Sequence, residues 1–131
     1  VILYPHKGGI NMNNMYITVT GLNHYYGKTP FKIGTIVKIS KEPDNDYDAE
    51  AIKVTLPQIN TIGYVANSTY TVLGGTMSAG RLYDKIGDFA FAEVMFITHS
   101  SIIGRVIDPD DVIEVSAITR YSYTNDKSEA F

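Results

Sequence analysis

The stretch KEPDNDYDAEAIKV, residues Lys41–Val54, decides the fold, because a dense run of acids passes directly into a strand-like segment. Five carboxylates fall within residues 42–50, together with Pro43 and Asn45, which are common turn formers. The segment AIKVTL that follows alternates apolar and polar residues and contains β-branched side chains. The stretch therefore predicts a polar turn that leads into a β-strand over Ala51–Leu56.

The alternating acids of this stretch resemble the start of an EF-hand calcium loop. Asp44, Asp46 and Asp48 match its first, third and fifth positions. The sixth position requires Gly but is Ala49, and the twelfth requires Glu but is Thr55. The chain has no cysteine, and its three histidines lie far apart. The sequence therefore predicts no metal site and no cofactor.

Alternating segments on both sides of this stretch predict a mainly β chain. The expected strands cover Met15–Gly21, Ile33–Ser40, Ala51–Leu56, Thr61–Ala66, Phe89–Ser100, Ser101–Ile107 and Val112–Ile118. Gly63 interrupts the fourth strand and indicates a bulge or a close approach of another backbone. Six or seven short strands of this spacing fit an OB-like barrel, an SH3-like barrel or a sandwich.

A change in pattern between the fourth and fifth strands predicts one or two short inserted helices. Asn67 or Ser68 is a candidate N-cap for the first helix, which Gly74 would end. Thr76 or Ser78 is a candidate N-cap for the second helix, which would reach about residue 85. The predicted fold is therefore a small β-barrel with a short helical insertion.

Length and composition predict one domain. The chain has 131 residues and a net charge of −3, and no apolar run approaches the roughly 20 residues that span a membrane. We expect a cytoplasmic domain over residues 15–118, preceded by an extension or leader over 1–14 and followed by a polar tail over 119–131. Met12 or Met15 offers an internal start.

Candidate catalytic groups are few and lack a motif. Glu93, Asp108 and Asp110 are the carboxylates that a hydrolase could use, but Asp108 and Asp110 lie in a segment of turn composition. His99 and Ser101 share one face of a predicted strand, yet no G-x-S-x-G motif is present. The sequence therefore predicts a protein that is not an enzyme, with carboxylate-based hydrolysis as an alternative.

The aromatic residues and the lysines suggest a different function. The chain has ten tyrosines and no tryptophan, and Tyr25 and Tyr26 lie together in the segment GLNHYYG. Flat side chains beside a small barrel can stack on nucleic-acid bases, although one tyrosine could equally belong to the core and the other cover the barrel end. A local basic strip is suggested by lysines that cluster in one third of the chain: Lys28, Lys32, Lys38, Lys41 and Lys53.

The opening stretch, followed by TIGYVA, resembles the HIRAN domain, a module of some SNF2-type DNA helicases that also occurs as small bacterial proteins. The family pattern is E-P-x-N-x-Y-D-x-x-A-I-x-V, then I-G-Y. The matching residues are Glu42, Pro43, Asn45, Tyr47, Asp48, Ala51, Ile52, Val54, Ile62, Gly63 and Tyr64. The resemblance covers about residues 15–107 and implies an OB-like barrel of about six strands, in the free-standing form.

The resemblance also implies a function, because the domain in helicase members binds single-stranded DNA and grips a free 3′ end. By position, Tyr47 would stack on the terminal base. Asp48 would accept a hydrogen bond from the 3′ hydroxyl. Tyr25 or Tyr26 would form a second aromatic wall.

Three further positions follow from the same resemblance. Tyr64 would place another polar ring near the DNA, and Lys41 would neutralise a phosphate. Phe89 or Phe91 would line the pocket. Helicase members carry an arginine in the aromatic loop, where this chain has only Asn and His. That difference removes a bidentate grip on phosphate.

Two alternatives remain at the level of the sequence. Asp48 could simply hold its loop through bonds to nearby backbone amides, with Tyr47 packed on the barrel. The domain could also act as a protein-interaction adaptor that binds no DNA. In that case an exposed edge strand over Val112–Ile118 would pair with a partner or with a second copy of the chain.

Overall fold

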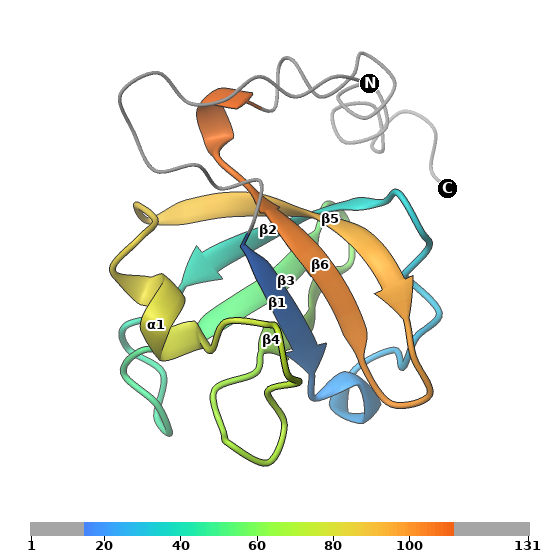
Figure 1. The fold of residues 1–131 in the computed structure, drawn as a ribbon, viewed down its shortest axis with the longest axis horizontal. Coiled ribbons are helices and arrows are strands. Elements are labelled where there is room, and N and C mark those ends of the chain that lie inside the picture. The colour runs from blue at the N-terminus through green and yellow to red at the C-terminus, as the bar shows by residue number, and fades with distance from the viewer. Residues whose placement is uncertain (1–14, 112–131) are drawn as a thin grey trace.

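Six antiparallel strands close into a barrel in the order β1-β4-β3-β2-β5-β6 in the computed structural model, which describes residues 15–111 (Figure 1). The strands are β1 Tyr16–Thr20, β2 Ile36–Lys41, β3 Ile52–Leu56, β4 Asn60–Val65, β5 Phe89–Ile97 and β6 Ile102–Ile107. Helix α1 spans Ala79–Tyr83, and short 3₁₀ turns span Leu22–His24 (η2) and Pro109–Asp111 (η3). The predicted mainly β, OB-like barrel is confirmed.

Some of the predictions fall outside the described part of the chain. These are the strand over Val112–Ile118, the leader over 1–14 and the tail over 119–131. Each of the six described strands pairs with two neighbours, and β1 closes the barrel against β6. Among residues 15–111 there is therefore no free strand edge. No helix in the same residues is long and apolar enough to cross a membrane.

The barrel interior is filled by the apolar residues of each alternating strand. These side chains are almost fully buried and include Ile17, Val19, Val37, Ile39, Ile52, Val54, Ile62, Ala92, Val94, Ile102 and Val106. Burying an aliphatic side chain of this size contributes about 1.5–3 kcal/mol relative to leaving it exposed. The alternating pattern therefore decides which face of each strand points inward, and the polar residues between them form the outer wall.

Strand pairing brings five of these outward residues into one row across the barrel. Ser40 pairs with Phe89 on one side and Lys53 on the other. Lys53 pairs in turn with Tyr64, and Tyr64 pairs with Thr20. Residues opposite one another on paired strands point to the same face. We call Phe89, Ser40, Lys53, Tyr64 and Thr20 the outer row.

Gly63 allows β4 to lie close to β1, as the sequence predicted. A Cβ atom at this position would lie 2.8 Å from Val19 Cγ1 and 3.0 Å from the carbonyl oxygen of Thr20. Only a residue without a side chain fits that space without a shift of the neighbours. The pairing register with β3 shifts at the same place: Val54 pairs with Gly63 and Thr55 with Thr61, so β4 has one extra residue between these partners.

The helical insertion contains one α-helix rather than two. Ser78 caps α1, because its hydroxyl accepts a hydrogen bond from the Arg81 amide at 3.2 Å, but the helix ends at Tyr83. The predicted first helix is wrong, since residues 67–75 form turns. Side-chain bonds compete with helix formation there: the Ser68 hydroxyl accepts from the Tyr70 amide, and the Thr18 hydroxyl of β1 accepts from the Leu73 amide.

Candidate functional site

The acidic loop that follows β2 is organised by Asn45. Its side-chain oxygen accepts hydrogen bonds from the backbone amides of Tyr47 and Asp48, at 2.9 and 3.0 Å. Its side-chain amide donates to Glu42 Oε1 at 2.7 Å. A short polar side chain that bonds its own loop in this way fixes a turn without secondary structure. We call residues 42–50 the acidic loop.

Asp48 ties the acidic loop to the segment that precedes α1. Its Oδ1 accepts from the Glu50 amide at 2.9 Å, and its Oδ2 accepts from Asn67 Nδ2 at 2.8 Å. Asn67 in turn accepts from the Gly80 amide at 2.8 Å through Oδ1. The structure thus gives Asp48 the loop-holding contacts of the alternative interpretation. Each carboxylate oxygen still has a lone pair available, because an ionised carboxylate has about four acceptor sites.

Tyr47 projects from the acidic loop into solvent. Its side chain is 97% exposed, and within the described residues no ring contact joins it to another aromatic residue. It does not pack on the barrel, which the structural alternative required. Tyr26 is also exposed, at 55%.

Tyr25 and Tyr64 are brought together at the barrel surface. Their ring centroids lie 6.4 Å apart with an interplanar angle of 39°. The loop that carries Tyr25 is shaped by Gly27, whose positive φ of 62° favours glycine and whose amide donates to the Leu22 carbonyl at 2.9 Å. Leu22 is buried in the core and anchors η2. Two aromatic residues from distant parts of the sequence therefore form one tilted pair.

Glu42 holds Tyr64 in place and was not among the predicted site residues. The Tyr64 hydroxyl donates to Glu42 Oε1 at 2.6 Å, and Lys53 Nζ lies 3.9 Å from Glu42 Oε2. The Tyr64 bond lowers the pKa of Glu42, and the Asn45 bond and the Lys53 charge act in the same direction. Burial, and then the bond to the carboxylate, raise the pKa of Tyr64. The sequence feature that could have indicated Glu42 is its position as the first residue of the E-P-x-N-x-Y-D pattern.

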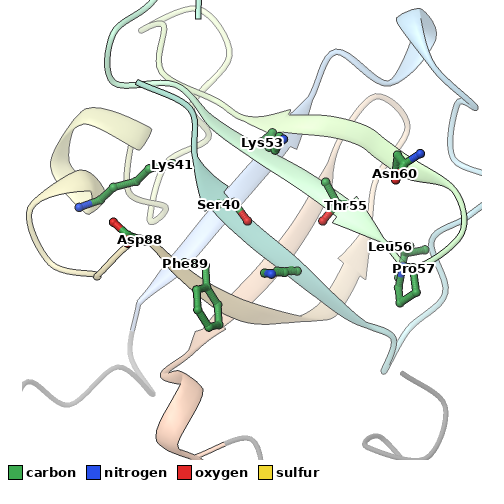
Figure 2. Close-up of a pocket in the computed structure, with 10 residues that line it drawn as sticks. Ser40, Lys41, Lys53, Thr55, Leu56, Pro57, Asn60, Asp88 and Phe89 are labelled. Carbon is green, nitrogen blue, oxygen red and sulfur yellow. The ribbon is translucent and has the colours of Figure 1, made fainter. Parts of the chain in front are cut away.

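The predicted basic strip is divided between several places. Lys28 donates to the backbone carbonyls of Thr98 and His99 at 3.2 and 3.0 Å. Lys41 points toward α1, where its Nζ lies 4.5 Å from the centroid of the Tyr83 ring (Figure 2). The amide of Lys41 itself donates to the carbonyl of residue 88.

Two other lysines of the strip, Lys38 and Lys53, lie together on the outer wall. They line an open hollow over β2, β3 and the start of β5 (Figure 2). The outward positions of Lys38 and Lys53 follow from strand alternation, so periodicity could have found them.

The candidate hydrolytic carboxylates make structural contacts. Glu93 Oε1 accepts from Arg105 Nη2 at 2.7 Å across β5 and β6. Asp108, the residue before η3, accepts through Oδ1 from the Asp110 amide at 2.8 Å. No group of three or more His, Asp or Glu side chains suited to a metal ion occurs among residues 15–111.

The closed antiparallel barrel with one short helix defines a small OB-like domain. The sequence model of the HIRAN domain matches residues 12–86, and the chain belongs to the HIRAN domain family. Among solved structures, the HIRAN domain of human HLTF superposes with a TM-score of 0.52 at 21% identity, covering 88% of this chain and 93% of that one. A protein from Lactobacillus plantarum superposes with a TM-score of 0.50 at 21% identity, covering 70% and 88% respectively. No curated protein matches this sequence.

Proposed function

We propose that this HIRAN domain is a nucleic-acid-binding module that binds single-stranded DNA and prefers a free 3′ end. The observation that carries the proposal is the Tyr25–Tyr64 pair beside Lys53 in the outer row. An aromatic platform next to a cation matches the chemistry of a single strand, which offers a π-face and a phosphate at every nucleotide. Stacking contributes about 1–3 kcal/mol per base without sequence preference.

The exposure of Tyr47 supports its role as a second stacking surface. Because the Tyr47 side chain is 97% exposed, it loses almost no contact with the protein when it turns onto a terminal base. Its backbone is already held by Asn45, so only the side-chain torsions remain to be fixed when a base binds. The side chain itself is ordered only when the base binds, which reduces the net gain by about 0.5–1.5 kcal/mol.

Asp48 supports the preference for an end. A carboxylate repels the phosphate of a continuous strand, whereas a terminal 3′ hydroxyl can donate a hydrogen bond to it. Asp48 is only half-buried and keeps acceptor capacity beyond its bonds to Glu50 and Asn67. A hydrogen bond to a charged acceptor contributes about 1.5–3 kcal/mol, which corresponds to a preference of at least about tenfold.

The test compares two decamers of deoxythymidine that differ only at the 3′ terminus, one with a hydroxyl and one with a phosphate. Fluorescence anisotropy at low salt should give about tenfold tighter binding for the hydroxyl end. Asp48→Asn should abolish that preference while it changes binding to the 3′-phosphate decamer much less. Asp46→Asn, an exposed acid of the same loop, is the matched control and should retain the preference. Equal affinity of the wild-type protein for both decamers would refute end recognition.

A further inference from the structure

The hollow on the outer wall of β2, β3 and β5 has its own chemistry. It is open, with a volume of about 810 Å³, and its lining includes Lys38, Ser40, Lys41, Lys53, Thr55 and Phe89. Neither Tyr47 nor Asp48 belongs to it, and neither do the rings of Tyr25 and Tyr64. We call it the β2–β3 hollow.

The charge of the β2–β3 hollow is opposite to that of the whole chain. Three lysines line it against a single carboxylate, Asp88, although the chain carries a net charge of −3. Lys38 has no carboxylate within ion-pair distance among residues 15–111, and Lys53 has only Glu42, at 3.9 Å. Lys38 thus carries a positive charge that no carboxylate of these residues offsets, next to the weakly paired Lys53. Such a local excess of positive charge attracts an anionic ligand even to an acidic protein.

The polar floor of the hollow suits phosphate oxygens. Ser40 and Thr55 supply hydroxyls from neighbouring strands, and both face the open space between Phe89 and Leu56 (Figure 2). Hydroxyls and ammonium groups are the side-chain donors that commonly bind phosphate and sugar, and these contacts carry no sequence information.

The contacts of the Phe89 ring favour a sugar–phosphate backbone over a base as the ligand of the hollow. Its ring is fixed by an edge-on contact with Phe91, with centroids 5.8 Å apart. Lys38 Nζ already lies over the Phe89 ring, 4.6 Å from its centroid. A stacked base would have to displace this cation, whereas a phosphate would bind it where it is.

The outer row joins the hollow to the aromatic pair. Ser40, Lys53 and Tyr64 are successive members of the row, on strands about 4.8 Å apart. Ser40 in the hollow therefore lies only about 10 Å from Tyr64 across the wall. We infer that the β2–β3 hollow is a phosphate-binding track for the DNA backbone that continues from the strand end, an inference that rests on the proposed function.

The experiment measures how the affinity for DNA depends on salt, with a dodecamer and a trimer of deoxythymidine that both end in a 3′ hydroxyl. Each phosphate contact on a single strand contributes about 0.7 to the slope of log K against log salt. Lys38→Ala should lower the dodecamer slope by about 0.7, and Lys38→Ala with Lys53→Ala should lower it by about 1.4. The trimer, which reaches only the end site, should keep its slope in Lys38→Ala, because Lys38 belongs to the hollow and not to the end site.

Lys32→Ala is the matched control, because Lys32 is exposed and lies outside the hollow. Its dodecamer slope should equal that of the wild type. Lys38→Ala is informative alone, since it leaves the Lys53–Glu42 contact in place.

An unchanged dodecamer slope in Lys38→Ala, with binding retained, would overturn the track and leave the proposed function standing. Failure of the wild-type protein to bind either oligonucleotide would overturn both. Tighter binding of inorganic tripolyphosphate than of the dodecamer would also overturn the track, because it would mark a site for small anions.

Discussion

Tyr47 and Tyr64 belong to the same family pattern but are held in opposite ways. Tyr64 lies on β4, packs against Tyr25 and donates to Glu42, so its ring is fixed by the barrel. Tyr47 lies on the acidic loop, where only its backbone is bonded and its ring is 97% exposed. The strand therefore supplies a preformed surface, and the loop supplies a side chain that a ligand must order.

The largest expected effect tests how β4 holds Tyr64. Gly63→Ala adds a Cβ against Val19 and the Thr20 carbonyl, and overpacking of this kind costs about 1–3 kcal/mol. Thermal unfolding followed by circular dichroism should show a lower Tm, by about 4–8 °C for each kcal/mol. Gly87→Ala is the control, because nothing lies within 4 Å of a Cβ at that exposed position. Equal Tm values for the two variants would contradict the close approach.

A smaller effect is expected when the side chain of Asn45, which fixes the acidic loop, is removed. Asn45→Ala removes the acceptor for the amides of Tyr47 and Asp48, together with the donor to Glu42. The expected loss is about 1–2 kcal/mol, confined to the loop. Hydrogen exchange at the Tyr47 and Asp48 amides should accelerate, while exchange at Tyr64 in β4 should not change.

Asp44→Ala is the control for this loop variant. Asp44 is an exposed neighbour in the same loop, and its side chain makes no hydrogen bond within residues 15–111. Faster exchange at Tyr64 in Asn45→Ala would show that the acidic loop and the barrel wall unfold together. That result would contradict the view that Tyr47 and Tyr64 are held independently.

The smallest expected effect concerns pH. The Tyr64 bond lowers the pKa of Glu42 below 4.5, so at acid pH the unfolded chain binds more protons than the folded one. The bond therefore stabilises the fold fully at pH 7, and this contribution falls as the pH drops below about 4.5. Tyr64→Phe should cost about 1 kcal/mol at pH 7, with a difference from the wild type that shrinks toward pH 3.

Tyr47→Phe is the matched control for the pH experiment. It removes the same hydroxyl from a ring that is almost fully exposed, so the unfolding free energy should change by less than about 0.5 kcal/mol at any pH. Chemical denaturation from pH 7 to pH 3 measures both variants. A penalty for Tyr64→Phe that is constant across this range would show that the Glu42 carboxylate does not depend on Tyr64.

Much of the fold could be predicted because its causes are local. Alternation located all six described strands, Gly63 indicated a bulge or a close approach of another backbone, and Ser78 was one of two candidate N-caps for α1. The wrong helix over 67–75 shows the limit of such reasoning. The sequence contained candidate caps and apolar residues for this helix. In the structure, however, the Leu73 amide donates to the Thr18 hydroxyl of β1 and not to a carbonyl of a helix.

The candidate site was predicted less completely, because it depends on residues that are distant in sequence. The pattern suggested Tyr47, Asp48 and Tyr64 as candidates, and the aromatic loop suggested Tyr25 or Tyr26. Nothing local indicated that Tyr25 would meet Tyr64, or that Asp48 would bond Asn67. The family assignment covers residues 12–86, whereas Phe89 of the hollow lies beyond them.

The sequence by itself determined the inward and outward faces of the strands, the polar turn and the family, since each depends on spacing along the chain. Only the tertiary structure decided which outward residues become neighbours. The register of β2, β3, β4 and β5 places Phe89, Ser40, Lys53 and Tyr64 in one row. The physical reason is that a strand's side-chain period is local, whereas pairing between strands is settled by closure of the whole barrel.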